Sequence, residues 1–397
     1  MKLRAALALL AVAALTAATA ATSAAGPSGK VPSCPSGTTA DDGLCVGKGA
    51  TAQQSAELVR SMFESESLGA VVIGVWKDGK PLLVGALGDS LSGVPSGIQA
   101  TVDMRHRAGN IGHMMIETVL LQQVEAGTLS LDDKLSKYLP DLPSADEITI
   151  DMVAHSTSGY EQYTVVPAFQ TAFYANPFQV MKIDDLIGYG VEGGPMYPPG
   201  TSWNFSDTNI LILARVLEEA TGKSVNSLVK KGVLDPLGMT HTTTQDSAAL
   251  PRPVLHSYTG ERDVWEEATF WNPSWTSFAG GWGSTQDDLR KLVEGVGTGK
   301  LVSKKSHEMQ LAPTSVGLGT STAERYYGMG ISVVNDWLLT APGLQGYHGS
   351  VGYLPDQKLT VVIYFTQTPE YDVTNRSTLL FEPLSAILAP ANAVSLG

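Results

Sequence analysis

Residues 120–140, LLQQVEAGTLSLDDKLSKYLP, carry the strongest fold signal in the chain. The first seven of these residues belong to a helical pattern of apolar residues that runs from about Ile111 to Ala126. Gly127 ends this helix. From there to about residue 300 the pattern is one of helices and long loops. The stretch therefore marks the entry into a long, mainly helical region.

Strand patterns lie on either side of this region. Residues 70–76 and 81–85 are apolar runs around an Asp-Gly turn, which predicts a β-hairpin. Later runs at 329–334, 346–354 and 359–365 also favour strands. We expect an α+β fold (an α/β sandwich) in which both ends of the chain build one antiparallel sheet around an inserted all-helical region.

The first 25 residues are expected to be a signal peptide. A basic start (Lys2 and Arg4) precedes an apolar run over residues 5–18 and a group of small residues. The apolar core, about 15 residues, is shorter than the roughly 20 that cross a membrane. We therefore predict no membrane span and a secreted, extracellular protein, or export of the periplasmic type.

Residues 26–50 form a Ser/Gly-rich lead-in that contains the only two cysteines, Cys34 and Cys45. In an exported chain such a close pair predicts one disulfide. A zinc site is the alternative, but further ligands would have to lie nearby. No metal-ligand spacing is found among His106, His241, His256 and His307. We expect neither a metal nor a cofactor. The net charge of -13 argues against nucleic acid as a partner.

Several local sequences together resemble the S12/class C-type branch of serine β-lactamases, D-Ala-D-Ala carboxypeptidases and related esterases. The resemblance covers nearly all of residues 50–390. It implies a β-lactamase/transpeptidase-like domain over 51–397, with sheet parts at 51–110 and 300–397 and a mainly helical part at 111–299. The matching segments are residues 120–140, ITI at 148–150, HSTSG at 155–159, PGT at 199–201, LDPLGM at 234–239, NPSW at 272–275 and GGWGST at 280–285.

The first catalytic motif of that family, Ser-x-x-Lys, is altered. In the family a serine at a helix start is deprotonated by a lysine one turn later, because that spacing places both on one helix face. The matching positions here hold Asn110 and His113. An amide has no alkoxide form and cannot act as this nucleophile.

The second and third motifs are altered as well. The family's Tyr-x-Asn corresponds to Phe205 and Asp207, so the proton-relaying hydroxyl is missing. The basic residue of the cleft strand corresponds to Thr340 or, with one gap, Ala341. His348 follows the Gly-Tyr pair instead of preceding it, and the basic role is not assigned to it.

Three altered motifs predict a non-acylating relative, either a pseudoenzyme or a ligand-binding protein. Its ligand would be a peptide, a cell-wall fragment or a small molecule in the old cleft. One alternative is a repurposed hydrolase in which Asp207 orients His113 as a general base. Another is an ordinary serine hydrolase whose nucleophile lies elsewhere, with Ser206 as a weak candidate. Asn204 and Asn375 begin sequons and are candidate glycosylation sites.

Overall fold

The computed structural model describes residues 34–91, 97–369 and 377–396. The predicted signal peptide (residues 1–25) and the sequon at Asn375 lie outside the described residues. All of these described residues belong to one structural unit.

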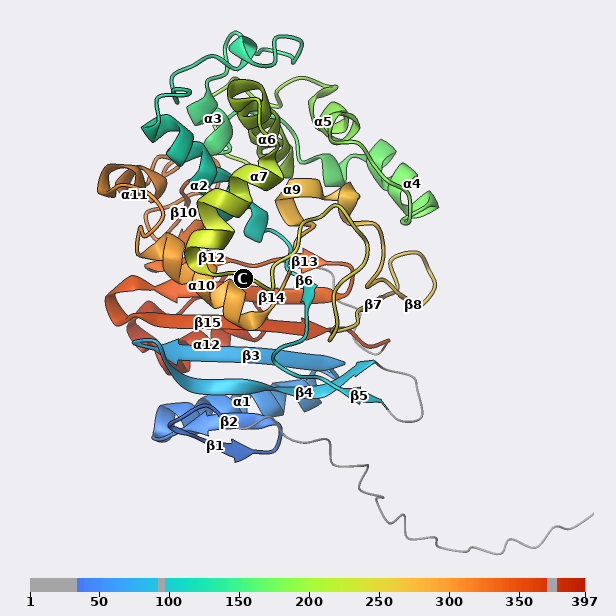
Figure 1. The fold of residues 1–397 in the computed structure, drawn as a ribbon, viewed down its shortest axis with the longest axis vertical. Coiled ribbons are helices and arrows are strands. Elements are labelled where there is room, and N and C mark those ends of the chain that lie inside the picture. Colours follow the sequence, from blue (N-terminus) through green and yellow to red (C-terminus); the bar gives the residue numbers. More distant parts are fainter. Residues whose placement is uncertain (1–33, 92–96, 370–376, 397) are drawn as a thin grey trace, which may run out of the picture. The chain divides into compact units, whose positions relative to one another are not determined.

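One antiparallel sheet of eleven strands is the base of the fold (Figure 1). Both ends of the described chain contribute strands, which confirms the predicted α+β architecture. The order is β1-β2-β4-β3-β15-β14-β12-β11-β10, with β5 paired to β4 and β13 to β14. The strands are β1 (Thr38–Asp41), β2 (Leu44–Gly47), β3 (Ala70–Lys77), β4 (Lys80–Leu91), β5 (Ile98–Gln99), β10 (Arg325–Tyr327), β11 (Ser332–Val334), β12 (Trp337–Thr340), β13 (Gly343–Leu344), β14 (Tyr347–Leu354) and β15 (Leu359–Thr366).

The centre of the sheet is apolar on both faces. Every residue of β15 is buried, and Ile363 pairs with Ile73 of β3. Such β-branched side chains favour strands because they pack well on a pleated surface. Residues on alternate positions point to opposite faces, so Val71, Ile73 and Val75 all join the apolar core on one side of the sheet.

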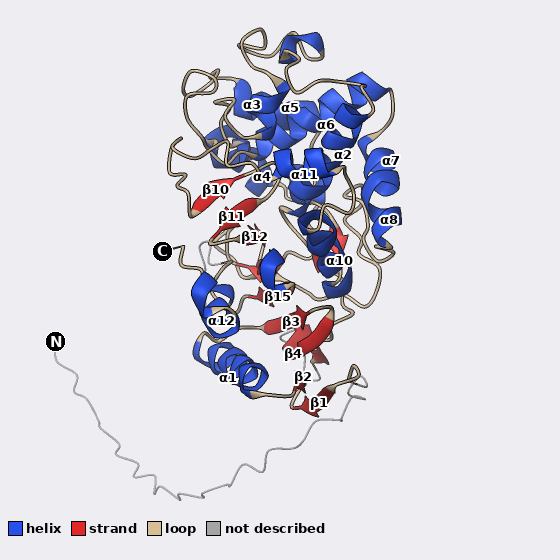
Figure 2. Cartoon of the chain, turned by 90° about the vertical axis from the view of Figure 1, so that its left-hand side faces the viewer, coloured by secondary structure: helices blue, strands red, loops and turns tan. Residues whose placement is uncertain are grey.

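Helices cover both faces (Figure 2). On one face α1 (Ala50–Ser65) packs on α12 (Phe381–Leu388), and both share an apolar core with the sheet. On the other face α10 (Gln286–Gly297) contacts β3, β14 and β15. The other helices of the inserted region lie beyond α10, as Figures 1 and 2 show.

Within the inserted region, α2 (Ile111–Glu125) is the central helix, and its first eleven residues are all buried. It contacts α6, α7 and α9. Among the described residues, no helix is long and apolar enough to cross a membrane. The remaining elements are β6 (His106–Arg107), α3 (Ile150–Ala154), α4 (Pro167–Ala175), α5 (Ile183–Val191), α6 (Asp207–Thr221), α7 (Val225–Val229), α8 (Asp235–Leu237), β7 (Tyr258–Thr259), β8 (Glu266–Glu267), α9 (Ser277–Gly280), β9 (Gly283–Ser284) and α11 (Lys304–Gln310).

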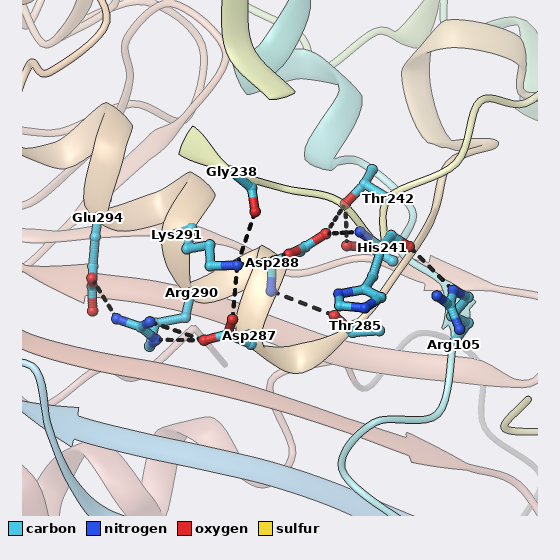
Figure 3. A network of polar contacts seen from close by, with 11 residues as sticks. Arg105, Gly238, His241, Thr242, Thr285, Asp287, Asp288, Arg290, Lys291 and Glu294 are labelled. Carbon is cyan, nitrogen blue, oxygen red and sulfur yellow. Dashed lines mark hydrogen bonds and ion pairs between the residues drawn. The ribbon is translucent and has the colours of Figure 1, made fainter. Parts of the chain in front are cut away.

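A polar network fixes the start of α10 against the loop that follows α8 (Figure 3). The carboxylate of the fully buried Asp288 accepts hydrogen bonds from the backbone N–H of His241, at 2.8 Å, and from the hydroxyl of Thr242, at 3.0 Å. Lys291 donates to the same carboxylate at 3.1 Å and to the carbonyl of Gly238 at 3.0 Å. These partners compensate the cost of burying the charge.

The lead-in contributes more structure than the sequence predicted. Residues 38–47 form the β1–β2 hairpin, and β2 pairs with β4 at the edge of the main sheet. The sheet therefore begins at Thr38, before the expected start at residue 51. Cys34 and Cys45 form the predicted disulfide, which ties the segment before β1 to β2.

Candidate functional site

A cavity of about 850 Å³ opens beside the first turn of α2. Its walls come from α2, the loop before α6, the segment around α4, and β10 to β14. The structure places all five candidate positions around it: Asn110, His113, Phe205, Asp207 and Thr340. The cavity is of a size that holds small-molecule or short peptide ligands in other proteins.

Close backbone contacts bring the walls together at two glycines. Gly109 has a φ of +62°, and a Cβ there would lie 2.4 Å from the Cβ of Pro342. Gly330 has a φ of +76°, and its Cβ would lie 2.6 Å from the carbonyl oxygen of His113. Only glycine adopts such conformations without strain at so close an approach. The first turn of α2 is thereby held against the segment after β12 and the segment after β10.

Asn110 occupies the N-cap of α2, where the family places its nucleophile. Its side chain is half-buried, lines the cavity and makes no hydrogen bond within the described chain, not even the usual N-cap bond. The amide offers donors and an acceptor, but no nucleophilic oxygen. It therefore suits the binding of a polar ligand group better than covalent attack.

His113 has partners on both ring nitrogens. Its Nε2 lies 2.7 Å from Oδ1 of Asp207, and its Nδ1 lies 3.0 Å from the hydroxyl of Tyr327. Because a carboxylate only accepts hydrogen bonds, Nε2 carries a proton, and in the neutral ring Nδ1 accepts from Tyr327. Phe205 stacks on the ring with the centroids 5.1 Å apart. No ring nitrogen is left free for a substrate.

Asp207 is held on its other side by Gln162. The Nε2 of Gln162 donates to Oδ2 of Asp207 at 2.9 Å, and the backbone N–H of Asp207 donates to Oε1 of Gln162 at 2.9 Å. The carboxylate thus receives bonds on both oxygens. It also stands in the first turn of α6, where the helix dipole favours a negative charge.

Tyr327 and Glu117 extend this polar group into the core, and sequence reasoning missed both, as it missed Gln162. Burial raises the pKa of the Tyr327 hydroxyl well above its usual range, and the nearby carboxyls of Glu117 and Asp207 raise it further. Burial likewise raises the pKa of Glu117 well above its usual range. Tyr327 is therefore a neutral phenol that donates a hydrogen bond, not a phenolate base.

The third motif region holds no basic side chain at the cavity. Thr340 ends β12 and is half-buried, and Ala341 follows it on the cavity wall. His348, on β14, also lines the cavity, but burial lowers its pKa to about 4. Its Nε2 meets the side-chain amide of Gln367. At neutral pH His348 is uncharged.

Serine is scarce around the cavity. Ser206 is fully buried, and its hydroxyl donates to the carbonyl of Glu161 at 3.0 Å, so it is not placed for attack. Ser332 of β11 is the one serine among the described lining residues. No hydrogen bond of the described chain joins its hydroxyl to a histidine or a carboxylate. Asn204, two residues before Ser206 in the chain, donates through Nδ2 to the carbonyl of Phe205 at 3.1 Å.

Aromatic side chains form part of the cavity wall. Phe169, Phe173 and Trp275 line the cavity, and the ring centroids of Phe173 and Trp275 are 4.9 Å apart. Trp271 and Trp282, by contrast, are core residues. Across the described chain, no group of three or more His, Cys, Asp or Glu side chains is arranged to hold a metal ion.

A family model and several curated proteins are similar in sequence to this chain. A family model described as Beta-lactamase matches residues 56–382. The chain is 29% identical over 246 residues to a putative penicillin-binding protein PbpX of Bacillus subtilis (strain 168), which covers 61% of this chain and 55% of that protein. The chain spans only about half the length of such curated relatives.

Solved structures share the fold. A D-stereospecific amidohydrolase from Streptomyces sp. has a TM-score of 0.73 and 22% identity, covering 86% of this chain and 99% of that one. A D-amino acid amidase from Ochrobactrum anthropi SV3, complexed with L-phenylalanine amide, has a TM-score of 0.71 and 16% identity, covering 85% of this chain and 98% of that one.

Proposed function

Because the chain belongs to the Beta-lactamase family, we propose that it is a member that binds a ligand in the family's cleft without forming an acyl-serine intermediate. The ligand class that we propose is a peptide, an amide or a cell-wall fragment. Penicillin-binding proteins and amidases among the relatives support this class.

One observation carries the proposal. The side chains at the start of α2 are an amide, Asn110, and an imidazole, His113, whose two nitrogens are occupied by Asp207 and Tyr327. Acylation needs a nucleophile and a base that takes its proton. Asn110 supplies no nucleophilic oxygen, and His113 has no free lone pair aimed at the cavity.

We also propose that the protein acts outside the cytoplasm after removal of residues 1–25. The disulfide between Cys34 and Cys45 supports this, because disulfides persist in oxidising compartments.

A repurposed hydrolase remains the second candidate, because the distance of 2.7 Å between His113 and Asp207 is that of an oriented base. In that case the proton would have to pass through the hydroxyl of Tyr327, which blocks Nδ1. Hydrolysis of p-nitrophenyl esters that is lost in both His113→Gln and Tyr327→Phe would support this candidate over the first.

Intact-protein mass spectrometry after exposure to a fluorescent penicillin and to a fluorophosphonate tests the proposal. The wild-type chain should show no adduct. The matched comparison is the revertant Asn110→Ser/His113→Lys/Phe205→Tyr/Asp207→Asn, which restores the family's side chains in the first two motifs and should be labelled. A stable adduct on the wild type would overturn the proposal. Loss of that adduct in Ser332→Ala would then identify Ser332 as the nucleophile.

A further inference from the structure

We infer that a groove between α4 and α5, outside the cavity, is a docking site for an extended, cationic peptide segment of a partner protein. The groove has a volume of about 670 Å³. None of the described residues that line it also lines the cavity. The inference therefore goes beyond the proposed function and does not depend on it.

Exposed apolar side chains gather around this groove. The described chain exposes nine large apolar side chains, and seven of them lie within residues 165–196 or 264–270. The two stretches meet in the fold, because the backbone N–H of Asn272, just after the second stretch, donates to the carbonyl of Pro177 at 2.9 Å. Val180, with an exposed fraction of 76%, lines the groove itself. Exposed apolar surface that is concentrated in this way marks an interaction site.

Hydrogen bonds hold the walls of the groove in place. The Nε2 of Gln179 donates to the carbonyl of Ala172 at 2.8 Å, which ties the segment after α4 back to that helix. The backbone N–H of Met181 donates to the hydroxyl oxygen of Ser274, also at 2.8 Å. A groove that is already formed needs little ordering when a ligand binds, which favours affinity.

The groove carries negative charge that the described chain does not balance. Asp184, Asp185 and Glu192 line it, and its described lining residues include no Lys, Arg or His. Arg215 pairs with Asp184 at 3.1 Å. The carboxylates of Asp185 and Glu192 are exposed, and neither has an ion pair or a side-chain hydrogen bond within the described chain. A cationic occupant complements these charges, whereas the same acidic face of a second copy would be repelled.

The two unpaired carboxylates also define the spacing of the cations. Asp185 and Glu192 are seven residues apart, with Glu192 as the helical C-cap of α5, so they share one face of the helix about 10 Å apart. Gly188 lies between them, and a Cβ there would meet nothing within 4 Å, so this strip is open. In a polyproline II segment, residues three apart point the same way at a distance of about 9 Å. A segment with two cations three residues apart fits this spacing.

The residues between the two cations are expected to be apolar. Tyr189, Val180 and Pro143 line the groove beside the carboxylates. Proline-rich segments in the polyproline II conformation bind to grooves that aromatic side chains line, because little conformational entropy is lost. The occupant that fits both features is a Lys-Pro-Pro-Lys type of segment.

Two peptides that differ only in charge test the inference. Leu-Lys-Pro-Pro-Lys-Leu-amide and its counterpart with Gln in place of Lys, each with a fluorescent label at the N-terminus, are titrated with the wild-type chain at pH 7. Fluorescence anisotropy at low salt should show that the lysine peptide binds at least tenfold more tightly than the glutamine peptide. This difference should shrink at high salt, because exposed charges are screened.

A charge-reversal variant locates the binding. Asp185→Lys/Glu192→Lys should lower the affinity for the lysine peptide at least tenfold. The matched control is Glu57→Lys/Glu64→Lys, which reverses two exposed carboxylates at the same spacing on α1 and should change the affinity less than twofold. All four positions are exposed, where substitutions have small effects on stability.

A second variant tests the apolar contact. Val180→Ser should weaken the binding of the lysine peptide at least threefold. Val316→Ser is the control, because Val316 is also exposed but does not line the groove, and it should leave the affinity unchanged. Equal effects of the two substitutions would contradict the assigned role of the groove.

Three further results would overturn the inference. The first is no binding of the lysine peptide, or equal binding of both peptides, by the wild type. The second is an equal loss in Glu57→Lys/Glu64→Lys, which would show only a general attraction to a chain of net charge -13. The third is a wild-type dimer in sedimentation that dissociates in Asp185→Lys/Glu192→Lys, which would show that a second copy occupies the groove.

Discussion

Nε2 of His113 lies 2.7 Å from Oδ1 of Asp207, and both side chains are nearly buried, with exposed fractions of 3% and 9%. These are the positions at which the family carries a lysine and an asparagine. The two replacements satisfy one another, with Tyr327 and Gln162 completing their hydrogen bonds. The altered motifs thus form one coupled polar group.

We expect this coupling to be measurable in stability. His113→Ala and Asp207→Ala should each lower the free energy of unfolding by about 2–4 kcal/mol, because each leaves a buried partner unpaired. The double variant should lose less than the sum, with a coupling energy of about 1–3 kcal/mol. Urea unfolding at pH 7 of the wild type, the two single variants and the double variant gives this coupling energy. Additive losses would mean that the contact contributes nothing.

Tyr327→Phe should remove only the hydroxyl that faces His113. The ring packing beside Trp203 and Phe205 stays, but Nδ1 of His113 loses its donor, at a cost of about 1–2 kcal/mol. Tyr326→Phe is the matched control, because that hydroxyl bonds the carbonyl of Leu311 in a more exposed place. Nitrogen NMR of the wild type should show the Nε2–H tautomer of His113; an Nδ1–H tautomer would contradict the assignment.

Regular patterns made much of the fold predictable from the sequence. The apolar periodicity over 111–126 predicted α2, and the Asp-Gly turn predicted the β3–β4 hairpin; both are confirmed. The β1–β2 hairpin was missed, because β1 is a short edge strand with mostly exposed side chains and no alternation of burial. The Thr, Asp and Gly content of residues 38–47 is typical of a loop.

The candidate site was predictable only in part. The family motifs named Asn110, His113, Phe205 and Asp207, and these side chains line one cavity. Tyr327 gave no signal, because its contact with His113 spans 214 residues and no local period connects the two. Gln162 lies 45 residues before Asp207 in a loop of no marked pattern. Contacts of this kind follow from the tertiary fold alone.

Acid should destabilise the protein through its buried histidines. Burial lowers the pKa of His106 and of His348 to about 4, against 6.5 in the unfolded chain. Between these values the unfolded state binds more protons, so the free energy of unfolding falls as the pH drops from about 6.5 to 4. Each histidine contributes at most about 1.4 kcal/mol per pH unit.

His348→Gln should therefore flatten this part of the stability profile, as measured by denaturant unfolding at several pH values between 4 and 7. His241→Gln is the control: the side chain is exposed, and only its backbone joins the network in Figure 3. A profile as steep in His348→Gln as in the wild type would refute the assigned cause.

Glu117 should show the opposite dependence on pH. Its carboxyl is fully buried one turn after His113, and no side chain in the described chain hydrogen-bonds either oxygen. The backbone N–H of Gly330 faces the carboxyl and offsets the effect of burial only in part. Burial, and then the charge of Asp151, raise its pKa well above the usual range. The folded state therefore keeps a proton that the unfolded state releases above about pH 4.5, and stability is lost as the pH rises.

Glu117→Gln removes this dependence while keeping the shape of the side chain. Relative to the wild type, its free energy of unfolding should improve steadily from pH 4.5 to 7.5, by at most about 1.4 kcal/mol per pH unit. Glu57→Gln, at an exposed position of α1, should show no such trend. Because each comparison is made at one pH, the contribution of the histidines cancels. A difference between Glu117→Gln and wild type that does not change with pH would show that the pKa of Glu117 is not raised in the folded protein, and would contradict this prediction.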